Sequence, residues 1–134
     1  MTSSEVLYLF RRIGFDIDLR VLTKFTDYIS SMMKDDRVLI IYENGEPYAL
    51  LLYSITNNHI PYLLKSDWTY LEHDPDGSTI YIEKLISKGW NKELRQEFER
   101  KILERHPQLT DAVWHKWAEW GDRQVTIKRR LQYV

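Results

Sequence analysis

Apolar residues recur at helical spacing through the first part of the chain. Residues 3–12 begin with a serine pair that can cap a helix, and Gly14 is expected to end that helix. Residues 16–36 place apolar side chains three and four positions apart, with Asp16 or Asp18 as the candidate cap. The predicted inner face of this second helix consists of Leu19, Leu22, Phe25, Ile29, Met32 and Met33. Two amphipathic helices are therefore expected before any strand.

The clearest pattern follows these helices. Residues 37–55 contain two apolar segments rich in Val, Ile, Leu and Tyr around Asn44-Gly45, the dipeptide typical of a tight β-hairpin. Both segments are nearly continuous in apolar residues, which indicates strands covered on both faces. The next stretch, 56–78, is irregular and includes a turn at Asp74–Gly77.

The second half alternates strand and helix patterns. Residues 79–87 read as a strand and 92–105 as a helix, with Asn91 as its N-cap and Pro107 just past its end. The predicted inner face of this helix consists of Leu94, Phe98, Ile102 and Leu103. Two further strand patterns, 111–120 and 123–134, meet at Gly121-Asp122.

This order of elements predicts an α+β fold. An antiparallel hairpin precedes a strand–helix–strand unit, and the helix crossover makes the two strands that flank it parallel. The expected architecture is one mixed sheet with two N-terminal helices. The 134 residues suit a single domain, 1–134, because a second domain would be too small to hold its own core.

Composition narrows the function classes. The chain has no cysteine, which excludes disulfides and thiolate chemistry, and its net charge of −1 does not favour a nucleic-acid partner. No apolar run approaches a membrane span, and the first residues lack the features of a secretory signal. A soluble cytoplasmic protein without a membrane partner is therefore expected.

The element order resembles the GNAT acyltransferase fold. It is more similar still to the toxin-activating (haemolysin-activating) lysine acyltransferases, in which a hairpin leads to Asp-Trp and then to a strand with an internal acid. Here the hairpin at 37–55 is followed by Asp67-Trp68 and by the strand 79–87. The similarity covers residues 37–130. It implies acyl transfer to a protein amine, with acyl-CoA or acyl carrier protein as the donor.

Glu83 is the first candidate catalytic residue. It lies inside the strand 79–87, where the toxin-activating family has an Asp. A carboxylate at this place can take the proton from an attacking amine. His115, in the strand 111–120, is the second candidate and would act as acid or base. The alternatives are a half-exposed or ion-paired Glu83 and a His115 that only packs.

A second candidate site is the junction between the strand 79–87 and the helix that follows. Free N–H groups at a helix start bind phosphate, so the junction is expected to hold a donor phosphate or phosphopantetheine arm. The residues concerned are Ser87, Lys88, Gly89, Trp90, Asn91 and Lys92. The GNAT loop has spaced glycines, and here Gly89 is the single glycine. The alternative is a plain capped helix with a turn at Gly89.

A rival function belongs to another class. Trp114, Trp117 and Trp120 recur every three residues, and on a partly exposed strand they would suit a protein interface. The alternative for these residues is core packing. All four histidines follow the hairpin, whereas the toxin-activating family has its catalytic His before it. A non-catalytic binding module, such as an inhibitor or accessory protein of a phage or mobile element, therefore stays open. A protein partner is expected, and a homo-oligomer is compatible with the pattern.

Overall fold

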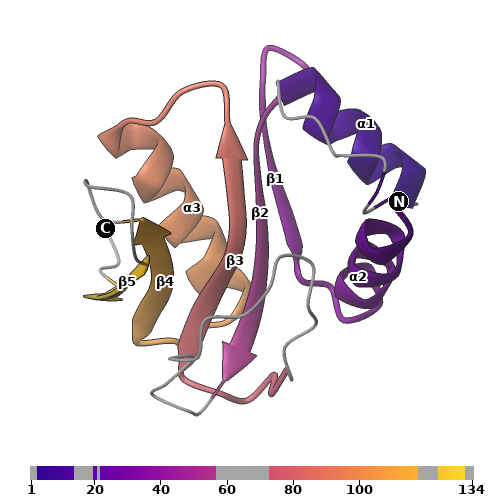
Figure 1. Ribbon diagram of the computed structural model, residues 1–134. Helices are drawn as coiled ribbons and strands as arrows, with labels where there is room; N and C mark the ends of the chain where they lie inside the picture. The colour runs from indigo at the N-terminus through magenta and orange to yellow at the C-terminus, as the bar shows by residue number, and fades with distance from the viewer. Residues whose placement is uncertain (1–2, 14–19, 21, 57–72, 118–123, 132–134) are drawn as a thin grey trace. The chain divides into compact units, whose positions relative to one another are not determined.

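The computed structural model describes residues 3–13, 20, 22–56, 73–117 and 124–131 (Figure 1). The helices are α1 (Ser3–Ile13), α2 (Leu22–Lys34) and α3 (Lys92–Arg105). The strands are β1 (Val38–Glu43), β2 (Glu46–Thr56), β3 (Thr79–Ser87), β4 (Asp111–Trp117) and β5 (Gln124–Arg130). The strands follow one another in the sheet in the order β1-β2-β3-β4-β5. The chain is therefore a mixed α+β protein with two N-terminal helices, as predicted.

The chain divides into two compact units that alternate along the sequence. Among the described residues, unit 1 holds α1, α2, β1, β2 as far as Tyr53, and residues 84–90. Unit 2 holds β2 from Ser54, β3 as far as Glu83, and then α3, β4 and β5. Each unit thus combines segments that are distant in sequence.

Unit 1 is built on an apolar core between its helices and its hairpin. Figure 1 shows α1 and α2 together beside β1. The buried cluster consists of Val6, Leu9, Phe10, Ile13, Tyr28, Ile29, Met32, Leu50 and Leu52. Ile29 and Met32 are fully buried, which confirms their place on the inner face of α2, and Met33 packs partly buried against the same cluster. Leu19, also predicted for this face, lies outside the described residues.

The hairpin of unit 1 forms as its turn residues predict. Asn44 and Gly45 have φ angles of 53° and 78°, the left-handed values that a two-residue hairpin turn of type I′ requires. β2 is buried without interruption from Ala49 to Ile55, so both of its faces are covered as expected. β1 pairs with it antiparallel, with a shift in register after Ile41.

That register shift is a β-bulge. Ile41 pairs with Ala49 and Tyr42 pairs with Pro47, so Tyr48 is the additional residue of β2 at this point. A bulge bends its strand and turns side chains into new directions. The side chain of Tyr48 lies close to Gly89, which follows the end of β3.

In unit 2, α3 begins and ends where its caps predict. The side-chain oxygen of Asn91 accepts a hydrogen bond from the Leu94 N–H at 2.7 Å, and the helix ends with His106 as its C-cap, before Pro107. The buried residues are Leu94, Phe98 and Ile102, three of the four predicted for the inner face. The fourth, Leu103, is half-buried.

The strands that flank α3 are parallel, as the crossover predicts. Their register joins Thr79 with Asp111, Ile80 with Ala112, and Tyr81 with Val113. β4 then continues to Trp117, and over its whole length it pairs antiparallel with β5, from Asp111–Arg130 to Trp117–Gln124. No helix within the described residues is long and apolar enough to cross a membrane.

Candidate functional site

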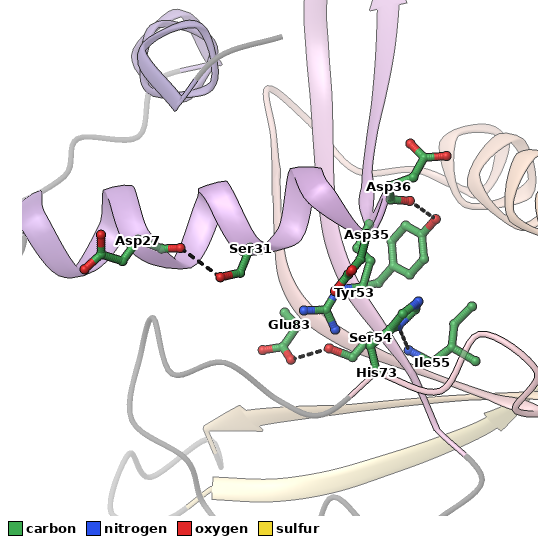
Figure 2. A network of polar contacts seen from close by, with 10 residues as sticks. Asp27, Ser31, Asp35, Asp36, Tyr53, Ser54, Ile55, His73 and Glu83 are labelled. Carbon is green, nitrogen blue, oxygen red and sulfur yellow. Dashed lines mark hydrogen bonds and ion pairs between the residues drawn. The ribbon is translucent and has the colours of Figure 1, made fainter.

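Glu83 has a defined partner on the neighbouring strand. The Ser54 hydroxyl donates a hydrogen bond to Oε1 of Glu83 at 2.8 Å (Figure 2). Ser54 is 1% exposed, whereas Glu83 is half-buried. The carboxylate in the middle of β3 therefore forms a specific contact across two strands of unit 2.

Tyr81 adds a neutral phenol beside this carboxylate. It precedes Glu83 by two residues on β3, so the two side chains leave the strand on the same face. Tyr81 is 3% exposed. Burial, and then the negative charge of Glu83, raise the pKa of the Tyr81 phenol well above its usual value of about 10. The phenol therefore stays protonated at neutral pH.

The backbone register relates Glu83 to His115. The last parallel pair joins Tyr81 and Val113, and each candidate lies two residues further along its own strand. On β4, His115 pairs with Thr126 of β5. The two residues proposed for acid–base chemistry thus occupy matching positions past the end of the β3–β4 register, both within unit 2.

His73 contacts the backbone of β2 at Ile55, the residue that follows Ser54. Its Nδ1 accepts the Ile55 N–H at 3.0 Å (Figure 2). The Asp74 N–H donates to the Ile55 carbonyl oxygen at 2.8 Å. An imidazole nitrogen accepts a hydrogen bond only when it carries no proton, so Nδ1 is unprotonated in this arrangement. His73 therefore anchors the start of the 73–77 turn to β2.

The carboxylate of Asp74 shapes the turn that follows. Its Oδ1 accepts the Asp76 N–H at 3.1 Å, while the Asp74 carbonyl oxygen accepts the Gly77 N–H at 3.0 Å. The turn predicted at Asp74–Gly77 is confirmed, with Asp74 as its first residue. Within the described residues, no group of three or more His, Asp or Glu side chains is placed to hold a metal ion.

The predicted donor-binding junction is divided between the two units. Ser87–Trp90 belongs to unit 1, where the Lys88 N–H donates to the Tyr48 carbonyl oxygen at 3.0 Å. Gly89 lies so close to Tyr48 that a Cβ at this position would be 2.8 Å from the tyrosine hydroxyl oxygen. A side chain at Gly89 would therefore require the Tyr48 side chain to shift.

Asn91 and Lys92 belong to unit 2, at the amino end of α3. The Asn91 cap already satisfies the Leu94 N–H. A phosphate at this helix end would therefore be bound by the N–H groups of the first turn that precede Leu94. Whether the junction binds an acyl donor stays a prediction.

The tryptophans predicted for an interface are placed by β4. Trp114 and Trp117 are both in this strand, as the pattern of residues 111–120 predicts, and Trp114 is half-buried. Trp120 lies outside the described residues. The large exposed aromatic residues of the described chain are instead Tyr8, Tyr42 and Trp90, which are 59%, 56% and 52% exposed. All three are in unit 1.

Sequence reasoning identified Glu83 and missed Ser54. The serine stands in the apolar run "ALLLYSI", which reads simply as a buried strand. The available signal was the hydroxyl itself, because a polar group inside a buried strand needs a hydrogen-bond partner. Its partner comes from a segment 29 residues away, which the sequence pattern does not specify.

No protein-family model matches this sequence, and comparison with the curated proteins finds no significant relative.

Proposed function

We propose that this protein is a GNAT-like acyltransferase that moves an acyl group from a thioester donor to an amine of a protein, with Glu83 as the proton acceptor. The observation that carries the proposal is the position of Glu83. Its half-buried carboxylate is held by Ser54, two residues past the last β3–β4 pair. The order of elements supports it, because an antiparallel hairpin leads into a parallel strand–helix–strand unit.

The reaction is a single acyl transfer. The amine nitrogen attacks the thioester carbonyl carbon, so a C–N bond forms and the C–S bond breaks. Glu83 accepts the proton that the nitrogen loses, and the thiolate leaves with the electrons of the C–S bond. The donor is acyl-CoA or acyl carrier protein, whose phosphate is assigned to the amino end of α3 beside Lys92.

His115 is assigned to the same site by its register position. It lies as far beyond Val113 on β4 as Glu83 lies beyond Tyr81 on β3. In the proposal it returns a proton to the leaving thiolate. When the donor thiolate leaves readily without a proton, replacing His115 should therefore lower the transfer rate less than replacing Glu83 does.

The first test is donor binding. Acetyl-CoA, octanoyl-CoA and octanoyl-acyl carrier protein are added separately to the purified protein, and thermal unfolding is followed. A donor that binds only the folded state raises the apparent stability, by about 2.7 kcal/mol at a concentration 100-fold above its Kd. We expect at least one of the three donors to raise the Tm.

The second test is transfer to a lysine-containing peptide, read by mass spectrometry. Glu83→Gln should lower the transfer rate by roughly 10²-fold or more, because the amide cannot take up the amine proton. Glu104→Gln is the matched control, since Glu104 is an exposed carboxylate on α3 that pairs with Arg100. Absence of stabilisation by every donor, together with equal transfer by wild type and Glu83→Gln, would rule the proposal out.

A second candidate function is a non-catalytic protein-binding module, such as an inhibitor or accessory protein. The observation that favours it is the exposure of Tyr8 and Trp90, since large exposed aromatic residues often anchor protein interfaces. One experiment distinguishes the two functions. A partner captured by the wild type should be lost with Trp90→Ala and kept with Glu83→Gln if binding is the function, and no acyl product should form.

A further inference from the structure

Ser54 is a buried hydroxyl within the apolar run of β2. The residues from Ala49 to Tyr53 before it and Ile55 after it are all buried. Burying a hydroxyl without a partner costs free energy, so a serine is disfavoured here unless it makes a hydrogen bond. Its contact with Oε1 of Glu83 supplies that bond. The serine and the glutamate therefore form a matched pair.

We propose that Ser54 is a positioning residue for Glu83. Its hydroxyl holds Oε1, and this contact directs Oε2 of the same carboxylate toward the amine of the substrate. The inference rests on the proposed acyl transfer. It adds a specific residue, on a different strand, that acts through Glu83 and does not itself touch the reacting atoms.

The physical reason is the flexibility of glutamate. A Glu side chain has several rotatable bonds, and a half-exposed carboxylate without a fixed partner populates several rotamers. A hydrogen bond from a hydroxyl to a charged carboxylate is among the stronger ones in proteins, and here its donor sits on a buried strand. The hydrogen bond from Ser54 thus favours one orientation of the Glu83 carboxylate before the substrate arrives.

Loss of the Ser54 contact should affect the alignment of Glu83 and not its ability to act as a base. When Ser54 is removed, Glu83 still accepts a proton but is aligned for only part of the time. Misplacement of a reacting group by about 1 Å can lower a rate by as much as 10²-fold. Donor binding involves other groups, so kcat should fall while KM for the donor changes little.

The experiment compares Ser54→Ala with Ser54→Thr, which keeps the hydroxyl. Transfer from octanoyl-CoA and from octanoyl-acyl carrier protein to the lysine peptide gives kcat and KM. The 13C signal of the Glu83 carboxyl carbon at constant pH reports directly on the hydrogen bond. Ser31→Ala is the matched control, because that hydroxyl donates to the Asp27 carbonyl oxygen on α2 and is remote in sequence from the site (Figure 2).

We expect Ser54→Ala to shift the Glu83 signal and to lower kcat by roughly 10- to 100-fold, with KM changed less than about 2-fold. Ser54→Thr should recover most of both effects, and Ser31→Ala should show neither. Each variant is first checked by its amide spectrum, and the carboxyl signal is read even from a variant of low activity.

Three results overturn the inference in distinguishable ways. An unchanged Glu83 signal in Ser54→Ala shows that the serine does not hold the carboxylate. A shifted signal with an unchanged kcat shows that the contact exists but does not position the base. An inactive wild type with all probes removes the proposed acyl transfer itself, and the positioning role falls with it, whatever the carboxyl signal shows about the contact.

Discussion

The two compact units place their buried polar groups in different surroundings. In unit 1 the buried polar side chain is Arg37, at the start of the hairpin, with its Nε 3.8 Å from Oδ2 of Asp35. An apolar cluster from α1, α2 and β2 forms a core of that unit. In the described part of unit 2 the buried polar side chains are Ser54 on β2, which donates to Glu83, and Thr79 on β3, the strand that carries Glu83.

The helices of the two units also differ in how many apolar side chains they bury. α1 and α2 contribute seven members of the core cluster, from Val6 to Met32. α3 buries three residues, and its outer face carries an Arg100 that pairs with both Glu97 and Glu104. Exposed ion pairs of this kind add little stability. The helices of unit 1 thus bury more apolar side chains than α3 does, and the candidate residues Glu83 and His115 both belong to unit 2.

The largest expected effect tests the core of unit 1. Phe10 is fully buried on α1, so Phe10→Ala should lower the free energy of unfolding by about 3–5 kcal/mol, through lost burial and the cavity it leaves. Urea unfolding measures the change. Tyr8→Ala on the same helix is the control, because Tyr8 is 59% exposed, and it should change stability by less than about 0.5 kcal/mol. Equal losses in the two variants would contradict the description of this core.

The second prediction concerns the pH dependence of the free energy of unfolding that Tyr81 of unit 2 causes. Burial and the charge of Glu83 raise the pKa of Tyr81 in the folded protein, so above pH about 10 the unfolded chain loses this proton while the folded chain keeps it. The stabilisation that the Tyr81 phenol contributes is therefore fully present below pH about 10. Above that pH the free energy of unfolding falls by roughly 1.4 kcal/mol per pH unit. Tyr81→Phe should remove this part of the alkaline loss.

Urea unfolding between pH 9 and 11 checks this prediction. The control is Tyr42→Phe, because Tyr42 is 56% exposed, and it should follow the wild-type pH dependence. If Tyr81→Phe loses stability with rising pH as steeply as the wild type does, the Tyr81 phenol is not buried beside the Glu83 carboxylate.

The smallest effect concerns the junction at the end of β3. Gly89→Ala would bring a methyl group to 2.8 Å from the Tyr48 hydroxyl oxygen. Since that oxygen is the far end of a side chain that can move, we expect a loss of only about 1 kcal/mol. Tyr48→Phe removes the oxygen and should make Gly89→Ala nearly neutral. A double-mutant cycle of urea unfolding measures the coupling, and additive effects would show that Gly89 is needed for another reason.

Local chemistry was enough to predict most elements of the fold. Asn44-Gly45 specified the hairpin turn, Asn91 specified the start of α3, and the spacing of Ile29 and Met32 specified the inner face of α2. These signals act over a few residues, where backbone sterics and capping decide the structure. The parallel pairing of β3 with β4 followed from the helix between them.

The candidate site was predicted only in part. Glu83 was found because a charge stands out in a strand pattern. Gly89 was predicted as part of a donor-binding junction, which stays a prediction, and only the structure shows that it lies close to the Tyr48 side chain. The exposed aromatic residues Tyr8 and Tyr42 were not identified, since their exposure depends on which faces the helices and the bulged hairpin bury.

The positions of the helices, turns and strands follow from local sequence, because each depends on neighbours within a few positions along the chain. Three relations emerge only in the folded chain: Ser54 faces Glu83, Tyr48 approaches Gly89, and the β3–β4 register ends after Tyr81. These relations join residues 29 to 41 positions apart, or mark where such pairing stops. They depend on how side chains fill space between strands, and no local pattern of apolar and polar residues records that packing.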